Sequence, residues 1–250
     1  GAHDRLVRNV KVVVEYDGTD YFGFQYQPGV PTIQAELERV IERIFKEKAT
    51  VYGSGRTDAG VHAAGQVISF RTSGTIPIDR VCVAMNSLLP QSIAALEASE
   101  ADESFHARYS AKSRLYRYDI LNRDEKSALR GRYCWHVRRL LDVERMRDSA
   151  EMLLGTHDFS SFAAADRDAG SPIRELQEIG VRRVGEHVLI EMRANAFLRG
   201  MVRIIVGTLV EVGLGFRPGP DVKDILQAAD RTAAGRTAPP RGLCLVEVEY

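Results

Sequence analysis

Strand-like and helix-like apolar segments alternate along this chain in an order that occurs twice, and this repeat limits the folds open to it. Val10–Tyr16 is rich in β-branched residues and ends at the turn pair Asp17-Gly18, as strands often do. After Thr32, which can cap a helix, apolar residues recur at helical spacing over residues 33–44. The first block therefore predicts a strand followed by a helix.

The rest of the chain completes this plan and then repeats it. Val67–Arg71 is a predicted strand, and Asp79 can cap a short helix that ends before Pro90. The second half has predicted strands at Arg114–Leu121 and Leu243–Tyr250, a hairpin that turns at Gly185-Glu186, and helices that begin at Asp142 and Asp221 or span Phe197–Val212.

This order predicts an α+β fold. Two similar α/β halves, residues 1–105 and 106–250, are expected to share a largely antiparallel mixed sheet with helices packed on it. No low-complexity linker separates the halves. We therefore expect one continuous sheet, with an active-site cleft between the halves.

Composition argues against several classes of protein. No apolar run approaches the roughly 20 residues that span a bilayer, and Gly1–Asp4 lacks the basic and apolar regions of a signal peptide. We expect a cytoplasmic protein with no membrane contact. The cysteines Cys82, Cys134 and Cys244 are widely spaced and form no C-x-x-C pair, which argues against a disulfide framework and a cysteine zinc site. They are expected to be small buried hydrophobes.

Charge is balanced overall but not locally. The formal net charge is +0, yet the segment from Arg108 to Arg147 holds ten arginines and two lysines against five acids. Arginine makes planar, bidentate contacts with phosphate. The stretch is a candidate nucleic-acid footprint, and a solvated basic face is the alternative.

The most unusual segment is glycine-rich and runs from Gly53 to His62. Its glycines let the backbone bend tightly, and Arg56 and Asp58 would share one side of an extended segment. No Gly-Lys-Ser/Thr follows, so it is not a Walker A loop, and no amphipathic helix opens at its last glycine, so it is not a dinucleotide fingerprint. The segment is a candidate catalytic loop, and a β-turn with an incidental Arg-Asp pair is the alternative.

Two further segments carry candidate functional residues. Arg203 lies inside an apolar run, where a guanidinium needs a partner; Asp58 is the favoured partner, and an arginine that reaches solvent is the alternative. Such a pair would hold the carboxylate ionised. Strand alternation places Tyr116 and Tyr118 on one face and Arg117 on the other. This pattern suits base stacking with phosphate contacts, or else an ordinary strand with inward aromatics.

These segments resemble the tRNA pseudouridine synthase A family, and the resemblance runs from about Val10 to Tyr250. Gly55–His62 matches the family's catalytic loop, which is a highly specific motif. Phe24 stands where many relatives carry tryptophan, so the position stays aromatic. Other matching blocks are Tyr16–Thr19 with Tyr21–Gln25, Phe105–Arg108, Tyr116–Tyr118, Gly155–Phe162, Met201–Arg203 with Val206-Gly207, and Ala238–Leu243.

The resemblance implies an isomerase that converts uridine to pseudouridine at positions 38, 39 and 40 of the tRNA anticodon stem-loop. Members need no metal and no cofactor, and they act as homodimers with tRNA lying across both subunits. By position, Asp58 is the nucleophile and Tyr116 stacks on the target base. Arg203 pairs with Asp58, and Arg56 helps to extrude the nucleotide.

The implied reaction breaks the N1–C1′ bond, turns the base and rejoins it through C5. The base must first flip out of its helix, at a cost of a few kcal/mol. Asp58 would act at C1′, on the base ring or in glycal formation, and the residues leave these routes open. Tyr116 is placed to remove the C5 proton, although an ordinary tyrosine pKa of about 10 favours stacking as its larger role.

Other functions fit the residues less well. A non-catalytic RNA-binding module would use the same Arg and Tyr surface without needing Asp58. A zinc base deaminase needs His-x-Glu and Pro-Cys-x-x-Cys, and neither occurs. A glycosidase needs paired carboxylates, and no spacing supports Asp17 with Asp58. His62 is predicted to brace the loop, and His157 to make a structural hydrogen bond at a helix end.

Overall fold

The computed structural model describes residues 6–250, and the chain divides into two compact units. The first unit consists of the residues up to Ala111 together with Leu245–Tyr250, and the second is Lys112–Cys244. Gly1–Asp4, where no signal peptide is expected, lies outside the described residues. Both units combine helices with mainly antiparallel strands, which confirms the predicted α+β class.

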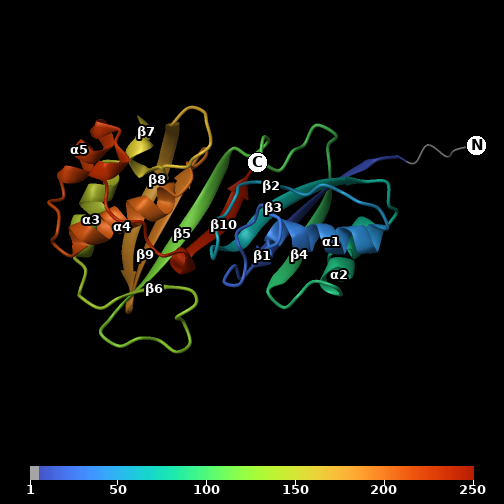
Figure 1. Ribbon diagram of the computed structural model, residues 1–250, viewed down its shortest axis with the longest axis horizontal. Helices are drawn as coiled ribbons and strands as arrows, with labels where there is room; N and C mark the ends of the chain where they lie inside the picture. The colour runs from blue at the N-terminus through green and yellow to red at the C-terminus, as the bar shows by residue number, and fades with distance from the viewer. Residues whose placement is uncertain (1–5) are drawn as a thin grey trace, which may run out of the picture. The chain divides into compact units, whose positions relative to one another are not determined.

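The first unit contains an antiparallel sheet (Figure 1). Strand β1 (Arg8–Tyr16) lies between β4 (Ile93–Ala101) and β3 (His62–Thr72) and is antiparallel to both. The short β2 (Tyr52–Gly53) pairs with β3, and β10 (Leu243–Glu249) neighbours β3 on its other side. The valines at positions 10, 12 and 14 are fully buried while the residues between them are more exposed, so one face of β1 packs against the core.

Helix α1 (Ile33–Phe45) begins where predicted, because the Thr32 hydroxyl accepts a hydrogen bond from the Ala35 N–H at 3.2 Å. Its inward face ends on Phe45, and Ile44 is only half-buried. Helix α2 (Ile78–Asn86) differs from the prediction. Its N-cap is Pro77 rather than Asp79, which lies in the first turn. Pro77 has φ −57° and ψ 143°, and no side chain caps the helix.

The second unit contains four antiparallel strands in the order β5 (Ser113–Asn122), β9 (His187–Ala194), β8 (Ile173–Val184) and β7 (Gly155–Asp158). Strand β6 (Trp135–Val137) pairs in parallel with β5. The predicted hairpin is confirmed, since Val184 pairs with His187 and Gly185 adopts φ +59°.

The helices of the second unit are α3 (Val143–Glu151), α4 (Met201–Gly213) and α5 (Asp221–Ala228), with short 3₁₀ turns at Ser160–Phe162, Arg231–Ala233 and Pro240–Gly242. Asp142 caps α3 as predicted, accepting from the Arg145 N–H at 3.1 Å.

Helix α4 is buried on nearly every side, as its apolar sequence predicts. It begins at Met201 rather than at Phe197, because Gly200 takes the left-handed conformation at φ +73°.

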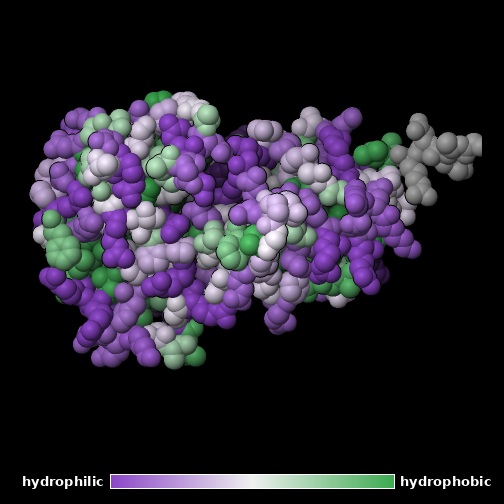
Figure 2. All heavy atoms as spheres, viewed as in Figure 1, coloured by the Kyte–Doolittle hydropathy of each residue, from purple (hydrophilic) through white to green (hydrophobic). Residues whose placement is uncertain are grey.

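Two expectations drawn from composition have different outcomes. No helix among residues 6–250 is long and apolar enough to cross a membrane. Of the cysteines, Cys134 is buried, but Cys82 and Cys244 are partly exposed, so the expectation of burial is wrong for these two. The face shown in Figure 2 is mainly polar, with hydrophobic residues in small groups.

Gly207 allows a close backbone approach inside the second unit. A Cβ atom at this position would lie 1.7 Å from the Arg236 carbonyl oxygen. The hydroxyl of the adjacent Thr208 accepts from the Gly235 N–H at 3.0 Å, and one turn earlier the Arg203 carbonyl accepts from the Ala238 N–H at 2.9 Å. Residues 235–238 therefore lie directly on α4.

We predict that Gly207→Ala lowers the free energy of unfolding by about 1–3 kcal/mol, because the methyl group forces residues 235–238 away from α4. Intrinsic helix propensity alone favours alanine over glycine by up to about 1 kcal/mol. A loss of stability in Gly207→Ala would therefore report the steric contact, whereas a gain would report helix propensity alone. Gly180→Ala is the control, because a Cβ there would meet nothing within 4 Å. Urea unfolding measures both variants, and a Gly207→Ala protein as stable as the wild type would contradict the contact.

Candidate active site

The glycine-rich segment forms the loop between β2 and β3, in the first unit. Arg56 is exposed, Thr57 is 5% exposed, and Asp58 is half-buried. An inward threonine between two more exposed charged residues agrees with the expectation that Arg56 and Asp58 share one side.

The start of this loop is held by Gln66, which lies on β3 and is fully buried. Its Oε1 accepts from the Ser54 N–H at 3.2 Å and the Ser54 hydroxyl at 2.5 Å, and its Nε2 donates to the Gly55 carbonyl at 2.9 Å. A buried amide is costly unless it is hydrogen-bonded, so these contacts fix the loop and the amide together. The sequence alone does not predict a role for Gln66; its one signal is a polar residue directly before the predicted strand Val67–Arg71.

The centre of the loop is held by residues 16–24. The Tyr16 hydroxyl lies 2.7 Å from the Thr57 hydroxyl, and the Phe24 N–H donates to the Thr57 carbonyl at 3.0 Å. Gly23 adopts φ +87°, and a Cβ there would lie 2.8 Å from the same carbonyl oxygen. Thr57 is thus fixed through both its side chain and its backbone, which also fixes the charged residues beside it.

The end of the loop is held by His62. The Gly18 N–H donates to His62 Nδ1 at 2.9 Å, and a carboxylate oxygen of Asp17 lies 3.3 Å from the same nitrogen. A Cβ on Gly18 would lie 1.9 Å from the Val61 carbonyl oxygen, so only glycine permits this contact. His62 braces the loop, as predicted.

In the second unit, Tyr116 and Tyr118 lie on one face of β5, as predicted, with Arg117 exposed on the other. The two tyrosines differ in their surroundings. Tyr116 is 8% exposed, and its ring meets that of Phe197 at 5.1 Å and 88°. Tyr118 is fully buried and donates to the Pro239 carbonyl at 2.6 Å, and burial raises its pKa above the usual value. Tyr118 is therefore part of the core.

Arg203 lies in the first turn of α4 and is half-buried. Its Nε donates to the Ala238 carbonyl at 2.8 Å, while its own carbonyl accepts from the Ala238 N–H at 2.9 Å. One residue thus fixes both the side chain and the backbone of Arg203. Asp58 and Arg56 belong to the first unit, and Tyr116 and Arg203 to the second.

His157 follows α3 in the same unit. Its Nε2 lies 2.7 Å from the Leu154 carbonyl oxygen, and its ring meets that of Phe159 at 5.7 Å. This is the structural hydrogen bond predicted near a helix end.

The basic stretch from Arg108 to Arg147 is not uniformly available to a nucleic acid. Arg114 is 9% exposed and donates to the Asn195 carbonyl at 2.7 Å, so it serves the fold. Arg138 instead forms an exposed ion pair with Asp124 at 2.7 Å. Exposed pairs contribute little free energy, so Arg138 can exchange this partner for a phosphate.

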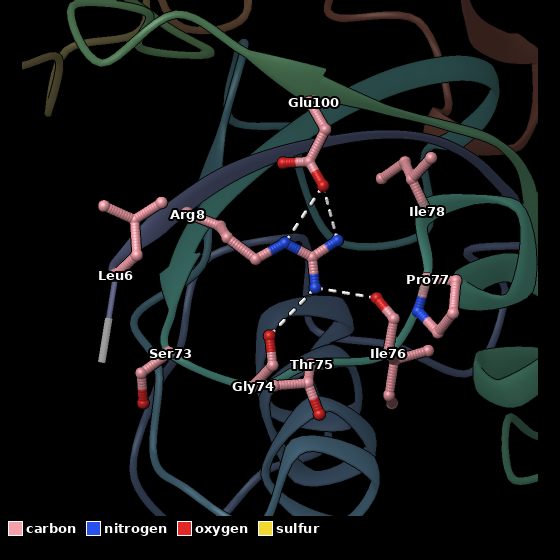
Figure 3. Close-up of a pocket in the computed structure, with 9 residues that line it drawn as sticks. All are labelled: Leu6, Arg8, Ser73, Gly74, Thr75, Ile76, Pro77, Ile78 and Glu100. Atoms are coloured by element: carbon pink, nitrogen blue, oxygen red, sulfur yellow. Dashed lines mark hydrogen bonds and ion pairs between the residues drawn. The ribbon is translucent and has the colours of Figure 1, made fainter. Parts of the chain in front are cut away.

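A hollow of ≈ 330 Å³ in the first unit is a further candidate for a ligand site (Figure 3). The guanidinium of Arg8 donates to the carbonyls of Gly74 and Ile76 and to the carboxylate of Glu100. These contacts join the ends of three segments and account for the charge, so the hollow is structural. Among residues 6–250, no group of three or more His, Cys, Asp or Glu side chains is arranged to hold a metal ion.

Comparison with known proteins places these residues in a family. The model of a family described as tRNA pseudouridine synthase matches residues 12–110 and 149–250. Arg56, Asp58 and Arg203 lie within the matched residues, whereas Tyr116 lies between the two matched ranges.

Individual relatives match the chain across that interval as well. The tRNA pseudouridine synthase A of Halalkalibacterium halodurans is 48% identical over 238 residues, which cover 95% of this chain and 90% of that protein. The proteins of the same name from Thermoanaerobacter sp. (strain X514) and Brevibacillus brevis are each 46% identical over 244 residues, which cover 98% of this chain and 100% of theirs. The chain therefore belongs to the tRNA pseudouridine synthase A family of isomerases.

Proposed function

We propose that this tRNA pseudouridine synthase acts on uridines 38, 39 and 40 of the anticodon stem-loop, with Asp58 as nucleophile and the target base flipped out of its helix. The loop geometry supports the role of Asp58. Thr57 is fixed by Tyr16 and Phe24, so its neighbour Asp58 is presented in a set position. The three positions in the tRNA rest on the resemblance to the family.

All the bonds that break and form in the reaction belong to one nucleotide, and no atoms are gained or lost overall. The N1–C1′ bond breaks, the base turns, and a C5–C1′ bond forms; C5 then loses a proton and N1 gains one. A carboxylate is an established nucleophile for such a bond exchange. Attack by Asp58 on C1′, attack on the base ring, and assistance to glycal formation all satisfy this balance.

Three other residues have proposed roles around Asp58. Arg56 is exposed next to it and fills the space left by the flipped base while contacting phosphate. The guanidinium of Arg203, whose plane is fixed by Ala238, pairs with the Asp58 carboxylate. Tyr116 stacks on the base and takes the C5 proton. Tyr116→Phe separates these two roles, since it keeps the ring and should bind tRNA while forming product more slowly.

The family resemblance also supports a homodimer, with tRNA lying across both subunits. Light scattering should give a mass of about twice the 27.8 kDa of one chain, and the mass of a single chain would exclude this proposal.

Removing the Asp58 carboxylate should abolish product formation. On an unmodified tRNA transcript, Asp58→Ala should lower the rate of pseudouridine formation by roughly 10³-fold or more, because the nucleophile is lost, while tRNA binding persists. Asp79→Asn, in the exposed first turn of α2, is the matched control and should keep full activity. Mapping the product reports which uridines react. Equal product from Asp58→Ala and wild type would remove Asp58 from catalysis, and binding without product in every protein would favour a non-catalytic RNA-binding role.

Replacing Arg203 should affect turnover more than folding. Arg203→Ala should lower kcat roughly 100-fold, because the nucleophile loses the cation that orients it. Arg147→Ala is the control, since Arg147 also donates its Nε to a carbonyl, that of Val181 at 3.1 Å, but has no proposed role at Asp58. Turnover and Tm are measured for both variants. Near-normal turnover with a lowered Tm in Arg203→Ala would show that Arg203 serves the fold alone.

A further inference from the structure

Three aromatic rings cluster at the surface of the first unit, outside the catalytic loop. The centroid of the His106 ring lies 4.6 Å from that of Tyr52 and 4.5 Å from that of Tyr109, with interplanar angles of 46° and 35°. Tyr52 is 46% exposed and Tyr109 is 77% exposed. The guanidinium of Arg108 lies 5.5 Å from the Tyr109 ring centroid. Large rings exposed together are more informative about function than single exposed apolar residues.

The backbone beneath these rings is held firmly. Ala107 is fully buried; its N–H donates to the Ser69 hydroxyl at 3.0 Å, and its carbonyl accepts from the Tyr250 hydroxyl at 2.5 Å. The Ser110 hydroxyl accepts from the His106 N–H at 3.0 Å, and the Ser110 N–H donates to the His106 carbonyl at 2.9 Å. The His106 and Tyr109 rings are therefore carried by a turn that is anchored to β3 and closed on itself, while Tyr52 lies on β2.

The orientation of the His106 ring is fixed as well. Its Nδ1 accepts from the Arg108 N–H at 3.0 Å and from the Tyr109 N–H at 3.3 Å, which places the proton of the neutral ring on Nε2. Burial and the nearby Arg108 charge lower the pKa of His106 from its usual 6.5. At neutral pH the ring is uncharged and suited to stacking.

We propose that Tyr52, His106, Tyr109 and Arg108 form a site that stacks an unpaired nucleotide of the RNA substrate, distinct from the nucleotide that is isomerised. Aromatic side chains stack on bases of any sequence, and an adjacent guanidinium contacts phosphate or adds a cation–π contribution. The identity of the RNA as tRNA rests on the proposed function, whereas the stacking chemistry does not.

The position of Tyr52 links this site to the catalytic loop. Tyr52 belongs to β2, which runs directly into the loop, and Asp58 lies six residues further along the chain. A fully extended segment of that length spans at most about 20 Å. A nucleotide held on the rings would thus be a near neighbour of the target in the same RNA, and would hold the strand while the target base turns.

Binding of an unmodified tRNA transcript to full-length variants tests the site. Tyr52→Ala and Tyr109→Ala should each raise the Kd by about 5- to 100-fold, the range expected when an aromatic ring that stacks on a base is removed. Tyr109→Phe keeps the ring and should bind like the wild type. Val83→Ala removes apolar surface from α2, at a residue 66% exposed, and should also bind like the wild type. Unchanged Tm values would show that the Ala variants are folded.

A fluorescent base identifies the nucleotide. 2-Aminopurine is placed in turn at each unpaired position of an anticodon stem-loop RNA, and its quenching on binding reports stacking. We expect a position whose quenching is lost in Tyr109→Ala and kept in Tyr109→Phe. Wild-type affinity in both Ala variants, equal loss in Tyr109→Phe and Tyr109→Ala, or no quenched position would each overturn the proposal. A failure of the proposed function would look different. No pseudouridine would form, yet the Ala variants would still bind the RNA more weakly than the wild type.

Discussion

The candidate catalytic loop, residues 53–62, keeps its shape because the buried amide of Gln66 supplies hydrogen bonds where the loop backbone leaves the sheet. It bonds Ser54 through Oε1 and Gly55 through Nε2, and Nε2 also lies 3.4 Å from the hydroxyl of Tyr16, which in turn contacts Thr57. Hydrogen bonds are stronger inside a protein than in water, and losing one partner of a buried group costs about 1–3 kcal/mol. The network therefore resists partial rearrangement. Such rigidity suits an active site, because a small displacement of a catalytic group lowers the reaction rate.

In the second unit, Arg203, the candidate functional arginine, is held in a different way. Ala238 binds both the backbone and the guanidinium of Arg203, and this requires residues 235–238 to lie against α4. Gly207 permits that approach because it has no side chain, where a Cβ would overlap the Arg236 carbonyl. In the first unit the buried side chain of Gln66 helps to position Asp58. In the second unit the lack of a side chain at Gly207 allows Ala238 to position Arg203.

The sequence predicts those features of the structure that depend on interactions between residues close together in the chain. The caps at Thr32 and Asp142 and the turn at Gly185 depend on a few neighbouring residues, and all three are confirmed. Strands β4 and β6 are not predicted, because Ile93–Ala101 is rich in alanine and glutamate, which are depleted in strands, and β6 is only three residues long. Apolar content predicted a helix from Phe197, but it indicates burial rather than conformation; Phe197 instead packs on Tyr116 before α4 starts. Arg56 and Asp58 are candidates from sequence because they are charged residues on a glycine-rich loop, whereas the hydrogen bonds of Gln66 to Ser54 and Gly55 form only in the folded chain.

The two proposed RNA contacts of the first unit share one structural origin. The β2–β3 hairpin carries the candidate catalytic loop at one end, and Ser69 of β3 anchors the turn that holds His106 and Tyr109. In the proposed reaction, turning the base requires that the rest of the RNA strand stay still, because motion of the target nucleotide relative to Asp58 would lose the entropic advantage of a preset geometry. Rigid rings with few rotatable bonds hold a neighbouring base at a smaller entropic cost than long flexible side chains. The β2–β3 hairpin therefore positions the proposed nucleophile directly, and it supports the His106 and Tyr109 rings of the proposed stacking site through Ser69.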